Sequence, residues 1–189
     1  MTIVKDKPKE DPKAILHEIE SMSPIVLQAI MTASTPRWAE RDVAPGDLAG
    51  VKVEKRQALF EQAKKLCDQK DYESAGKICG YLAALEPGNE LYVFTFAGCL
   101  QRTGQLEAAE FLYKHCAEGT LGAISSYRLG ECLESLGRPA DAWSAYEDGL
   151  KRAGHDRAMA SVAAMATKAL QALQTRLSSA KNGSSKEKA

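Results

Sequence analysis

The sequence has no long apolar run and no net charge. Its 25 basic and 25 acidic side chains cancel, so no long-range field draws the chain to nucleic acid or to an anionic membrane. No stretch approaches the roughly 18 consecutive apolar residues that indicate a membrane-spanning helix. The N-terminus is charged and lacks the apolar segment of a secretory signal. These absences predict a soluble, cytoplasmic protein that neither binds nucleic acid nor inserts into a membrane.

Disulfide, metal and catalytic patterns are also missing. The five cysteines are widely spaced and contain no Cys-x-x-Cys pair, which is typical of small apolar residues in a reducing compartment. The three histidines lie far apart, and no phosphate loop or nucleophile motif accompanies them. Cys116 follows His115, but adjacent helix residues point about 100° apart. We therefore expect a protein that is not an enzyme, with no catalytic residue, no metal and no cofactor.

The sequence does contain a helical repeat. Ala, Leu, Glu, Lys and Gln dominate residues 54–178 without alternating β-branched or aromatic runs, which favours helix throughout. Leu59 and Val93 stand at equivalent places 34 residues apart, and Ser126 follows Val93 by 33. This is the period of the tetratricopeptide helix-turn-helix unit. An ordinary helical bundle with coincidental spacing is the alternative.

Small residues recur where the two helices of each hairpin would touch. They are Ala63, Ala97 and Gly130 on the first helices and Ala75, Ala109 and Ala142 on the second. Larger residues four positions later, Cys79, Tyr113 and Tyr146, are expected to fill the gap to the next repeat. Gly104 and Gly137 suit left-handed turns, and Pro87 ends a helix. The prediction is an all-α fold with three tetratricopeptide repeats that form a concave superhelical groove.

The remaining segments complete the predicted organisation. Asp11-Pro12 and Ser23-Pro24 are helix-start pairs, so two helices, about 12–21 and 24–32, should precede the array and either dimerise the chain or cover the groove. A Pro- and Gly-rich connector follows, anchored by Trp38. The predicted parts are N-terminal helices in 1–34, the connector in 35–53, repeats in 54–154, an amphipathic capping helix in 155–178 and a disordered tail in 179–189.

The concave face of such an array is lined by positions two, five, nine and twelve of each first helix. Position five is aromatic in all three copies, and Gly98 at a central position nine leaves room for a ligand residue. Apolar groups in register along a groove indicate a peptide site, although N-terminal helices folded into the groove would also bury them. Position twelve includes Cys67 and Glu134. The candidate client-binding residues are Gln57, Phe60, Lys64, Leu91, Phe94, Gly98, Gln101, Ile124, Tyr127 and Glu131.

Two phrases go beyond the tetratricopeptide consensus. Residues 85–89 read LEPGN and are followed by Tyr92 and by AGCLQ at 97–101, while GECL at 130–133 precedes Leu136-Gly137. These phrases resemble the class II chaperones of bacterial type III secretion, in which a Leu-Asp-Pro-x-Asn turn precedes Tyr and Gly-Ala-Cys-Leu-Gln, and Ala-Glu-Cys-Leu precedes Leu-Gly. The resemblance covers about residues 55–154. The chain departs from the family at 117–122 (AEGTLG), where an acidic, proline-rich joint is usual.

The resemblance implies a function in secretion. Such a chaperone is cytoplasmic, has no ATPase activity, and keeps a hydrophobic translocator soluble and secretion-competent by holding a short Pro- and Leu-containing segment in its groove. The implied partner is a secreted translocator or effector protein, with a homodimer also possible. The alternative is a general tetratricopeptide adaptor or scaffold. An adaptor that clamps C-terminal carboxylates would need more cations on the first helices than Lys64 and Arg102.

Overall fold

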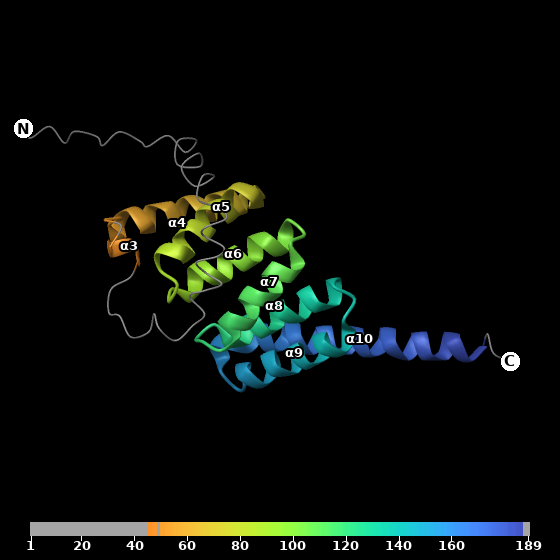
Figure 1. The fold of residues 1–189 in the computed structure, drawn as a ribbon. Helices are drawn as coiled ribbons and strands as arrows, with labels where there is room; N and C mark the ends of the chain where they lie inside the picture. The colour runs from red at the N-terminus through yellow and green to blue at the C-terminus, as the bar shows by residue number, and fades with distance from the viewer. Residues whose placement is uncertain (1–44, 49, 187–189) are drawn as a thin grey trace, which may run out of the picture. The chain divides into compact units, whose positions relative to one another are not determined.

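The protein is helical and divides into two units. The computed structural model describes residues 45–48 and 50–186 (Figure 1). The first unit ends at Gly88 and the second begins at Asn89. No strand occurs in these described ranges, so the predicted all-α class is confirmed. The predicted N-terminal helices and Trp38 lie outside the described residues.

The helices succeed one another with short connections. The first unit contains α3 (Pro45–Leu48), α4 (Val53–Asp68) and α5 (Tyr72–Leu85). The second contains α6 (Glu90–Arg102), α7 (Leu106–Ala117), α8 (Gly122–Ser135), α9 (Pro139–Ala153), the 3₁₀ helix η2 (Arg157–Met159) and α10 (Ala160–Lys186). Within the units α4 packs on α5, α6 on α7, α7 on α8 and α8 on α9. This order is a series of helical hairpins, as the repeat predicts.

The first hairpin is closed by small residues and a tight turn. Ala63 on α4 and Ala75 on α5 are both 0% exposed, as expected for small residues where two helices pack closely. The turn contains Lys70 with φ 63°, a left-handed conformation that costs a residue with a Cβ free energy. Asp71 then accepts a hydrogen bond from the backbone N–H of Ser74 at 3.1 Å and caps α5.

A buried arginine holds α3 against this hairpin. The side chain of Arg56 is 2% exposed and forms ion pairs with Asp47 at 2.9 Å and with Glu86 at 3.1 Å. Its guanidinium also donates to the carbonyl of Val51 at 2.8 Å. A Cβ on Gly46 would lie 2.4 Å from the same guanidinium, so a larger residue there would displace the arginine from its partners. Gly46, Asp47 and Val51, which were predicted to be part of a connector, thus contact the Arg56 side chain of α4.

The hairpins of the second unit turn at glycines. Gly104 has φ 82° and Gly137 has φ 72°, which confirms the predicted left-handed turns. Ala97 and Ala109 are 0% exposed where α6 meets α7, and Ala142 is 0% exposed on α9. These glycines and alanines set the short connections and the close approach of the helices.

The large residues of α7 and α9 support their own hairpins. Tyr113 and Tyr146 are 1% and 2% exposed. A Cβ on Gly130 would lie 2.4 Å from the Tyr146 ring, so the ring covers the backbone of α8 in the same repeat. The expectation that these tyrosines fill the gap to the next repeat was incomplete. Each ring also lies beneath the first helix of its own hairpin.

Helix α10 caps the second unit. It packs on α9 and α8, and its Val162 joins Ala123 and Ala153 in a buried apolar cluster. The helix continues to Lys186, past the predicted boundary at residue 178 and through much of the segment predicted to be disordered. Among the described helices, none combines the length and hydrophobicity needed to cross a membrane.

Candidate functional site

The candidate site in the second unit begins with the exposed face of α6. Leu91 is 48% exposed, an unusual degree for a leucine in a helical hairpin, and Phe94 and Gly98 are partly exposed. The three residues are spaced three and four apart, so they share one side of the helix. The face therefore presents an apolar surface that ends at a residue without a side chain.

Tyr113 supports this face from below. The rings of Phe94 and Tyr113 meet edge to face, with centroids 5.7 Å apart, and the Tyr113 hydroxyl donates to Oε1 of Gln101 at 2.9 Å. Burial raises the pKa of Tyr113 well above its usual value, so the hydroxyl stays protonated at neutral pH. The hydrogen bond therefore fixes the orientation of the Gln101 amide beside Gly98.

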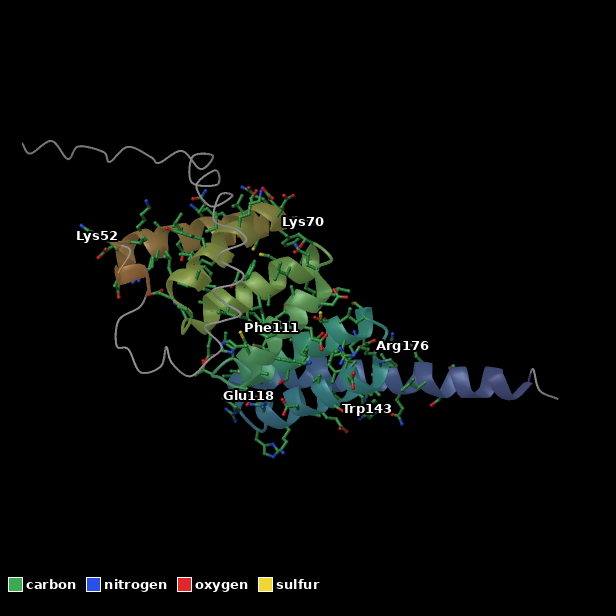
Figure 2. All side chains as sticks on the ribbon, viewed as in Figure 1. Lys52, Lys70, Phe111, Glu118, Trp143 and Arg176 are labelled. Carbon is green, nitrogen blue, oxygen red and sulfur yellow. The ribbon has the colours of Figure 1, made fainter. Side chains whose placement is uncertain are left out.

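The next hairpin repeats this arrangement with an acid in place of the amide. The Tyr127 and Tyr146 ring centroids are 5.7 Å apart, and the Tyr146 hydroxyl donates to Oε1 of Glu134 at 2.7 Å. Arg176, which projects from α10 (Figure 2), pairs with the other oxygen of Glu134. The position-twelve side chain is thus held by the tyrosine of the second helix in both repeats.

A second polar group lies one turn earlier on α8. The Tyr127 hydroxyl donates to Oε1 of Glu131 at 2.8 Å, and Arg128 donates to Oε2 at 2.8 Å. The Arg128 guanidinium lies 5.8 Å from the centroid of the Tyr127 ring, within the range of cation–π attraction. Burial, and after it the bond to Glu131, raises the pKa of Tyr127 to about 12. At neutral pH the group is an ion pair with a neutral phenol.

The capping helix narrows the accessible part of α8. Ile124 and Tyr127 pack against the cluster of Ala123, Ala153 and Val162, together with Met159 and Ala163. Both predicted site residues are consequently only partly exposed. Of the predicted residues in the second unit, Leu91 is exposed, and Phe94, Gly98, Gln101 and Glu131 are partly exposed, as Ile124 and Tyr127 are.

Three predicted site residues belong to the first unit. Gln57 and Lys64 are exposed on α4, but Phe60 is 8% exposed. The Lys64 ammonium lies 5.5 Å from the centroid of the Phe60 ring. Phe60 was predicted to line the concave face as a client-binding residue, but its burial places it in the core.

Arg128, Tyr113 and Tyr146 contribute to the site but were not predicted as site residues. Arg128 occupies position six, directly after the position-five Tyr127, but the equivalent positions hold Glu61 and Thr95, so the repeat gave no signal for it. The sequence did contain a signal for the two tyrosine hydrogen bonds, because each tyrosine follows the position-twelve residue that it binds by 12 residues.

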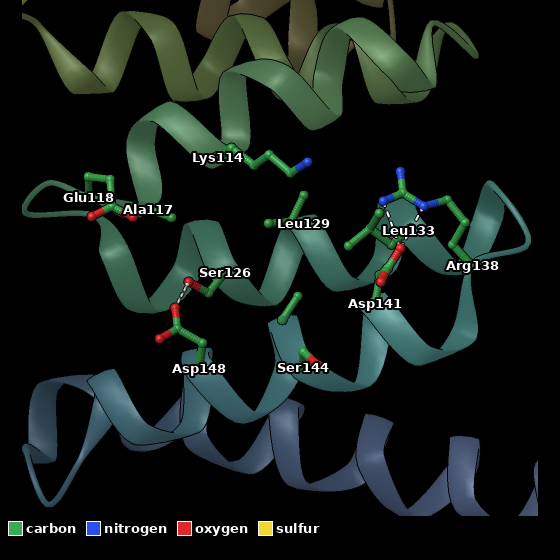
Figure 3. Close-up of a pocket in the computed structure, with 11 residues that line it drawn as sticks. Lys114, Ala117, Glu118, Ser126, Leu129, Leu133, Arg138, Asp141, Ser144 and Asp148 are labelled. Carbon is green, nitrogen blue, oxygen red and sulfur yellow. Dashed lines mark hydrogen bonds and ion pairs between the residues drawn. The ribbon is translucent and has the colours of Figure 1, made fainter.

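A separate hollow of about 510 Å³ lies between α7 and α9 (Figure 3). Arg138 donates to both oxygens of Glu110, at 2.8 and 2.9 Å, and Lys114 pairs with the same carboxylate. Ser126 donates to Asp148 at 2.6 Å on the other side. The apolar floor is nearly closed, since Leu133 is only 2% exposed. The hollow is a gap between packed helices that is bridged by ion pairs, and it offers little apolar surface to a ligand.

Metal-binding geometry is not found in the described ranges, where no group of three His, Cys, Asp or Glu side chains converges.

Several solved structures share the arrangement of helices. A type III secretion complex from Aeromonas hydrophila aligns with a TM-score of 0.67 and 22% identity over 71% of this chain and 91% of the other. The Yersinia enterocolitica translocator chaperone SycD gives 0.65 and 19% over 70% and 99%. PcrH of Pseudomonas aeruginosa, in complex with the chaperone binding region of PopD, gives 0.64 and 23% over 67% and 96%. No protein-family model and no curated protein sequence matches the chain.

The chain has the fold of the type III secretion translocator chaperones. The alignments span more than nine-tenths of each of these three chains but about two-thirds of this chain, so nearly all of their fold is shared and this chain is longer. The phrases that carried the sequence resemblance lie in its core, with Cys99, Cys132 and Leu133 each at most 2% exposed. The number of repeats, three by sequence, stays a prediction.

Proposed function

We propose that this protein is a cytoplasmic chaperone of type III secretion that binds a hydrophobic translocator protein and keeps it soluble until export. The binding surface would be the concave face formed by the first helices of the repeats. The chaperone would use no catalytic residue, because its task is to hold a segment of the client.

The observation that carries this proposal is the exposed apolar face of α6 in a translocator-chaperone fold. Leu91 is 48% exposed and stands beside Phe94, and the structurally similar PcrH was solved with a segment of the translocator PopD. Exposed apolar groups in register are a common mark of a protein-binding surface. Aromatic residues near the centre of such surfaces often contribute most of the binding free energy.

The test is co-expression with the translocators encoded in the same secretion gene cluster. We expect the chaperone to increase the soluble fraction of a translocator and to co-purify with it. Truncation of a central aromatic typically costs about 2 kcal/mol of binding free energy, so Phe94→Ala should weaken the complex about thirtyfold.

Phe111→Ala is the matched control. Phe111 is 40% exposed on α7 (Figure 2) and lies on a second helix, so the same truncation there should leave the affinity unchanged. Circular dichroism establishes that both variants are folded. Equal affinities for Phe94→Ala and wild type would place the client elsewhere, and the absence of any soluble complex with each translocator would refute the chaperone function.

A further inference from the structure

Glu90, the first residue of α6, reaches across to the joint between α7 and α8. Oε2 of its carboxylate accepts hydrogen bonds from the Thr120 hydroxyl at 2.8 Å and from the backbone N–H of Leu121 at 3.1 Å. Burial alone would raise the pKa of Glu90, but these hydrogen bonds outweigh it and hold the pKa below its usual value. At neutral pH a carboxylate therefore ties the start of one hairpin to the start of the next.

Helix α8 lacks a cap of its own at this end. Its N-cap residue, Leu121, makes no side-chain hydrogen bond, and its first turn contains no acidic residue. The free N–H groups at the N-terminus of a helix favour a nearby negative charge. The joint itself, residues 118–121, contains a glycine and no proline, so its composition does not stiffen the backbone. Glu90 thus supplies a cap and a restraint that the local sequence does not.

Gly119 makes room for this carboxylate. A Cβ on Gly119 would overlap the carboxylate of Glu90. The φ angle of Gly119 is not positive, so the backbone conformation alone does not require glycine. The missing side chain is therefore best explained by the side chain of Glu90 that lies there.

The same position of the repeat makes an equivalent contact in each hairpin. Position one, which precedes position two, holds Arg56, Glu90 and Ala123. Arg56 pairs with Glu86, 30 residues further on, at 3.1 Å. Glu90 binds Thr120, also 30 residues on. Ala123 shares a buried apolar cluster with Ala153, at the same separation. The contact recurs as an ion pair, a hydrogen bond and an apolar contact, which indicates that its role is placement.

The tether at Glu90 affects the candidate binding face, because α6 and α8 have little direct contact. Helix α6 packs on α7 and α7 packs on α8, but in the described part of the chain α6 and α8 do not pack closely on each other (Figure 1). Leu91 and Ile124, the position-two residues of these helices, directly follow position one. The spacing of α6 and α8 is therefore set by α7 and by this tether.

We propose that Glu90 is a positioning residue of the chaperone, which holds α8 at a fixed distance from α6 and keeps the binding face ready for its client. This inference rests on the proposed function and adds the residue that sets the spacing of the face. Glu90 acts through the joint and not by touching the client. A preformed surface loses less free energy to ordering when it binds, so a loosened tether should weaken binding without the loss of a contact.

The first test measures the affinity of the full chain for the translocator with which it co-purifies. Glu90→Ala should weaken this complex about tenfold, a size that residues acting through the fold can reach. Glu107→Ala is the matched control, because Glu107 is the acidic residue in the first turn of α7, a second helix. Its affinity should equal that of the wild type. Glu90→Gln keeps an acceptor oxygen and should retain most of the affinity.

A second test breaks the tether from its other side. Gly119→Ala should displace the carboxylate and weaken binding as much as Glu90→Ala does. Since both changes break one tether, the variant with both should also be about tenfold weaker than the wild type. Independent effects would instead multiply to about a hundredfold, and that result would refute the pairing of Glu90 with Gly119.

A third test measures the spacing without any client. Spin labels are attached to Thr95→Cys on α6 and Ser135→Cys on α8, in a Cys67→Ser background that removes the partly exposed native thiol. The distance distribution should be narrow in otherwise wild-type protein and with Glu107→Ala, and broader with Glu90→Ala. Melting curves followed by circular dichroism establish that each variant is folded at the temperature of measurement.

The combined results separate the possible roles of Glu90. An unchanged distance distribution with Glu90→Ala overturns the tether, and weaker binding with that unchanged distribution would mean that Glu90 contacts the client directly. A broader distribution with unchanged affinity would overturn the positioning role. If the wild type binds no translocator, the proposed function fails, while the distance measurement still decides whether Glu90 sets the spacing.

Discussion

At the scale of single residues, Gly98 and Gly130, two helical glycines of the second unit, have opposite structural roles. A Cβ on Gly130 would lie 2.4 Å from the Tyr146 ring, whereas a Cβ on Gly98 would have a normal contact at 3.6 Å. The Tyr146 ring cannot easily retreat, because it is 2% exposed and its hydroxyl is bound to Glu134. One glycine serves the core, and the other leaves the surface open.

This difference predicts opposite changes in stability. Gly130→Ala should lower the free energy of unfolding by about 1–2 kcal/mol, because overpacking outweighs the better helix propensity of alanine. Gly98→Ala should raise it by about 0.5–1 kcal/mol. Urea unfolding followed by circular dichroism measures both. Equal stabilities of the two variants would contradict the contact between Gly130 and Tyr146.

At the scale of elements, the short helix α3 depends on Arg56. Removing one partner from a buried ion pair typically costs about 3 kcal/mol or more. Arg56→Met should therefore destabilise the first unit by roughly this amount, and Arg56→Lys should restore only part of it, because an ammonium cannot form the same forked contacts. Hydrogen exchange of the backbone amides in residues 50–56 reports the loss locally. Unchanged protection of these amides in a folded Arg56→Met variant would show that Arg56 does not hold α3 against the hairpin.

The connection between α7 and α9 gives a pH-dependent prediction. Burial alone would raise the pKa of Glu110, but hydrogen bonds from Lys114 and Arg138 outweigh it and hold the pKa below its usual value. A carboxyl group with a lowered pKa in the folded state stabilises the protein above the pKa of the unfolded chain, about 4.3. This stability is lost as the pH falls through the folded-state pKa.

The melting temperature should therefore fall as the pH is lowered from about 5 towards 3. Glu110→Gln should be less stable at pH 7 and should show a shallower fall, since one of the shifted groups is gone. Hydrogen bonds from Ser126 and Arg152 outweigh burial and lower the pKa of Asp148 as well. Asp148 therefore maintains part of the pH dependence of the melting temperature in that variant. Parallel melting curves for the two proteins over this range would exclude Glu110 as a contributor.

These elements also show what the sequence could predict. The positions of Ala109 and Gly104 follow from the repeat period, since the close helix contact and the left-handed turn constrain the residue type locally. Arg56 could not be found in this way, because an arginine in a helix is normally exposed and its partners lie on other elements. Residues 179–186 are polar and were expected to be disordered, but α10 includes them.

The candidate site also contains some residues that the sequence could predict and others that it could not. Leu91 and Phe94 were predicted because helix periodicity determines which residues share a face. The burial of Phe60 and the roles of Tyr113 and Arg128 were not, because they depend on which side chains meet after folding. A four-position template of the concave face contains no information on the hydroxyl groups beneath it.

At the scale of the whole molecule, the cysteines provide a test that covers both units. Cys79, in the first unit, and Cys99, Cys116 and Cys132, in the second, are at most 2% exposed, while Cys67 is partly exposed. Burial, and after it nearby acidic groups, raises the pKa of Cys116 to about 12 and that of Cys132 to about 11. Reactivity needs an accessible thiolate, so these thiols should be inert in the folded protein.

A thiol-reactive dye should therefore label Cys67 rapidly and the other four cysteines only on unfolding. Reducing agents and chelators should leave the melting temperature unchanged, because no disulfide joins the five cysteines and no group of potential metal ligands converges in the described ranges. Mass spectrometry of the labelled peptides assigns each rate to a cysteine. Rapid labelling of Cys116 or Cys132 under native conditions would show that the second unit opens more readily than its packing indicates.

Lys70 has a consequence for the evolution of the chain. It adopts φ 63° in the turn of the first hairpin, whereas the turns of the next two hairpins contain Gly104 and Gly137. A left-handed residue with a Cβ costs about 1 kcal/mol of stability. A single change of this lysine to glycine would relieve that cost without altering the candidate binding surface. The first unit thus has a stability reserve within one substitution, which could compensate for mutations that adapt the surface to a new client.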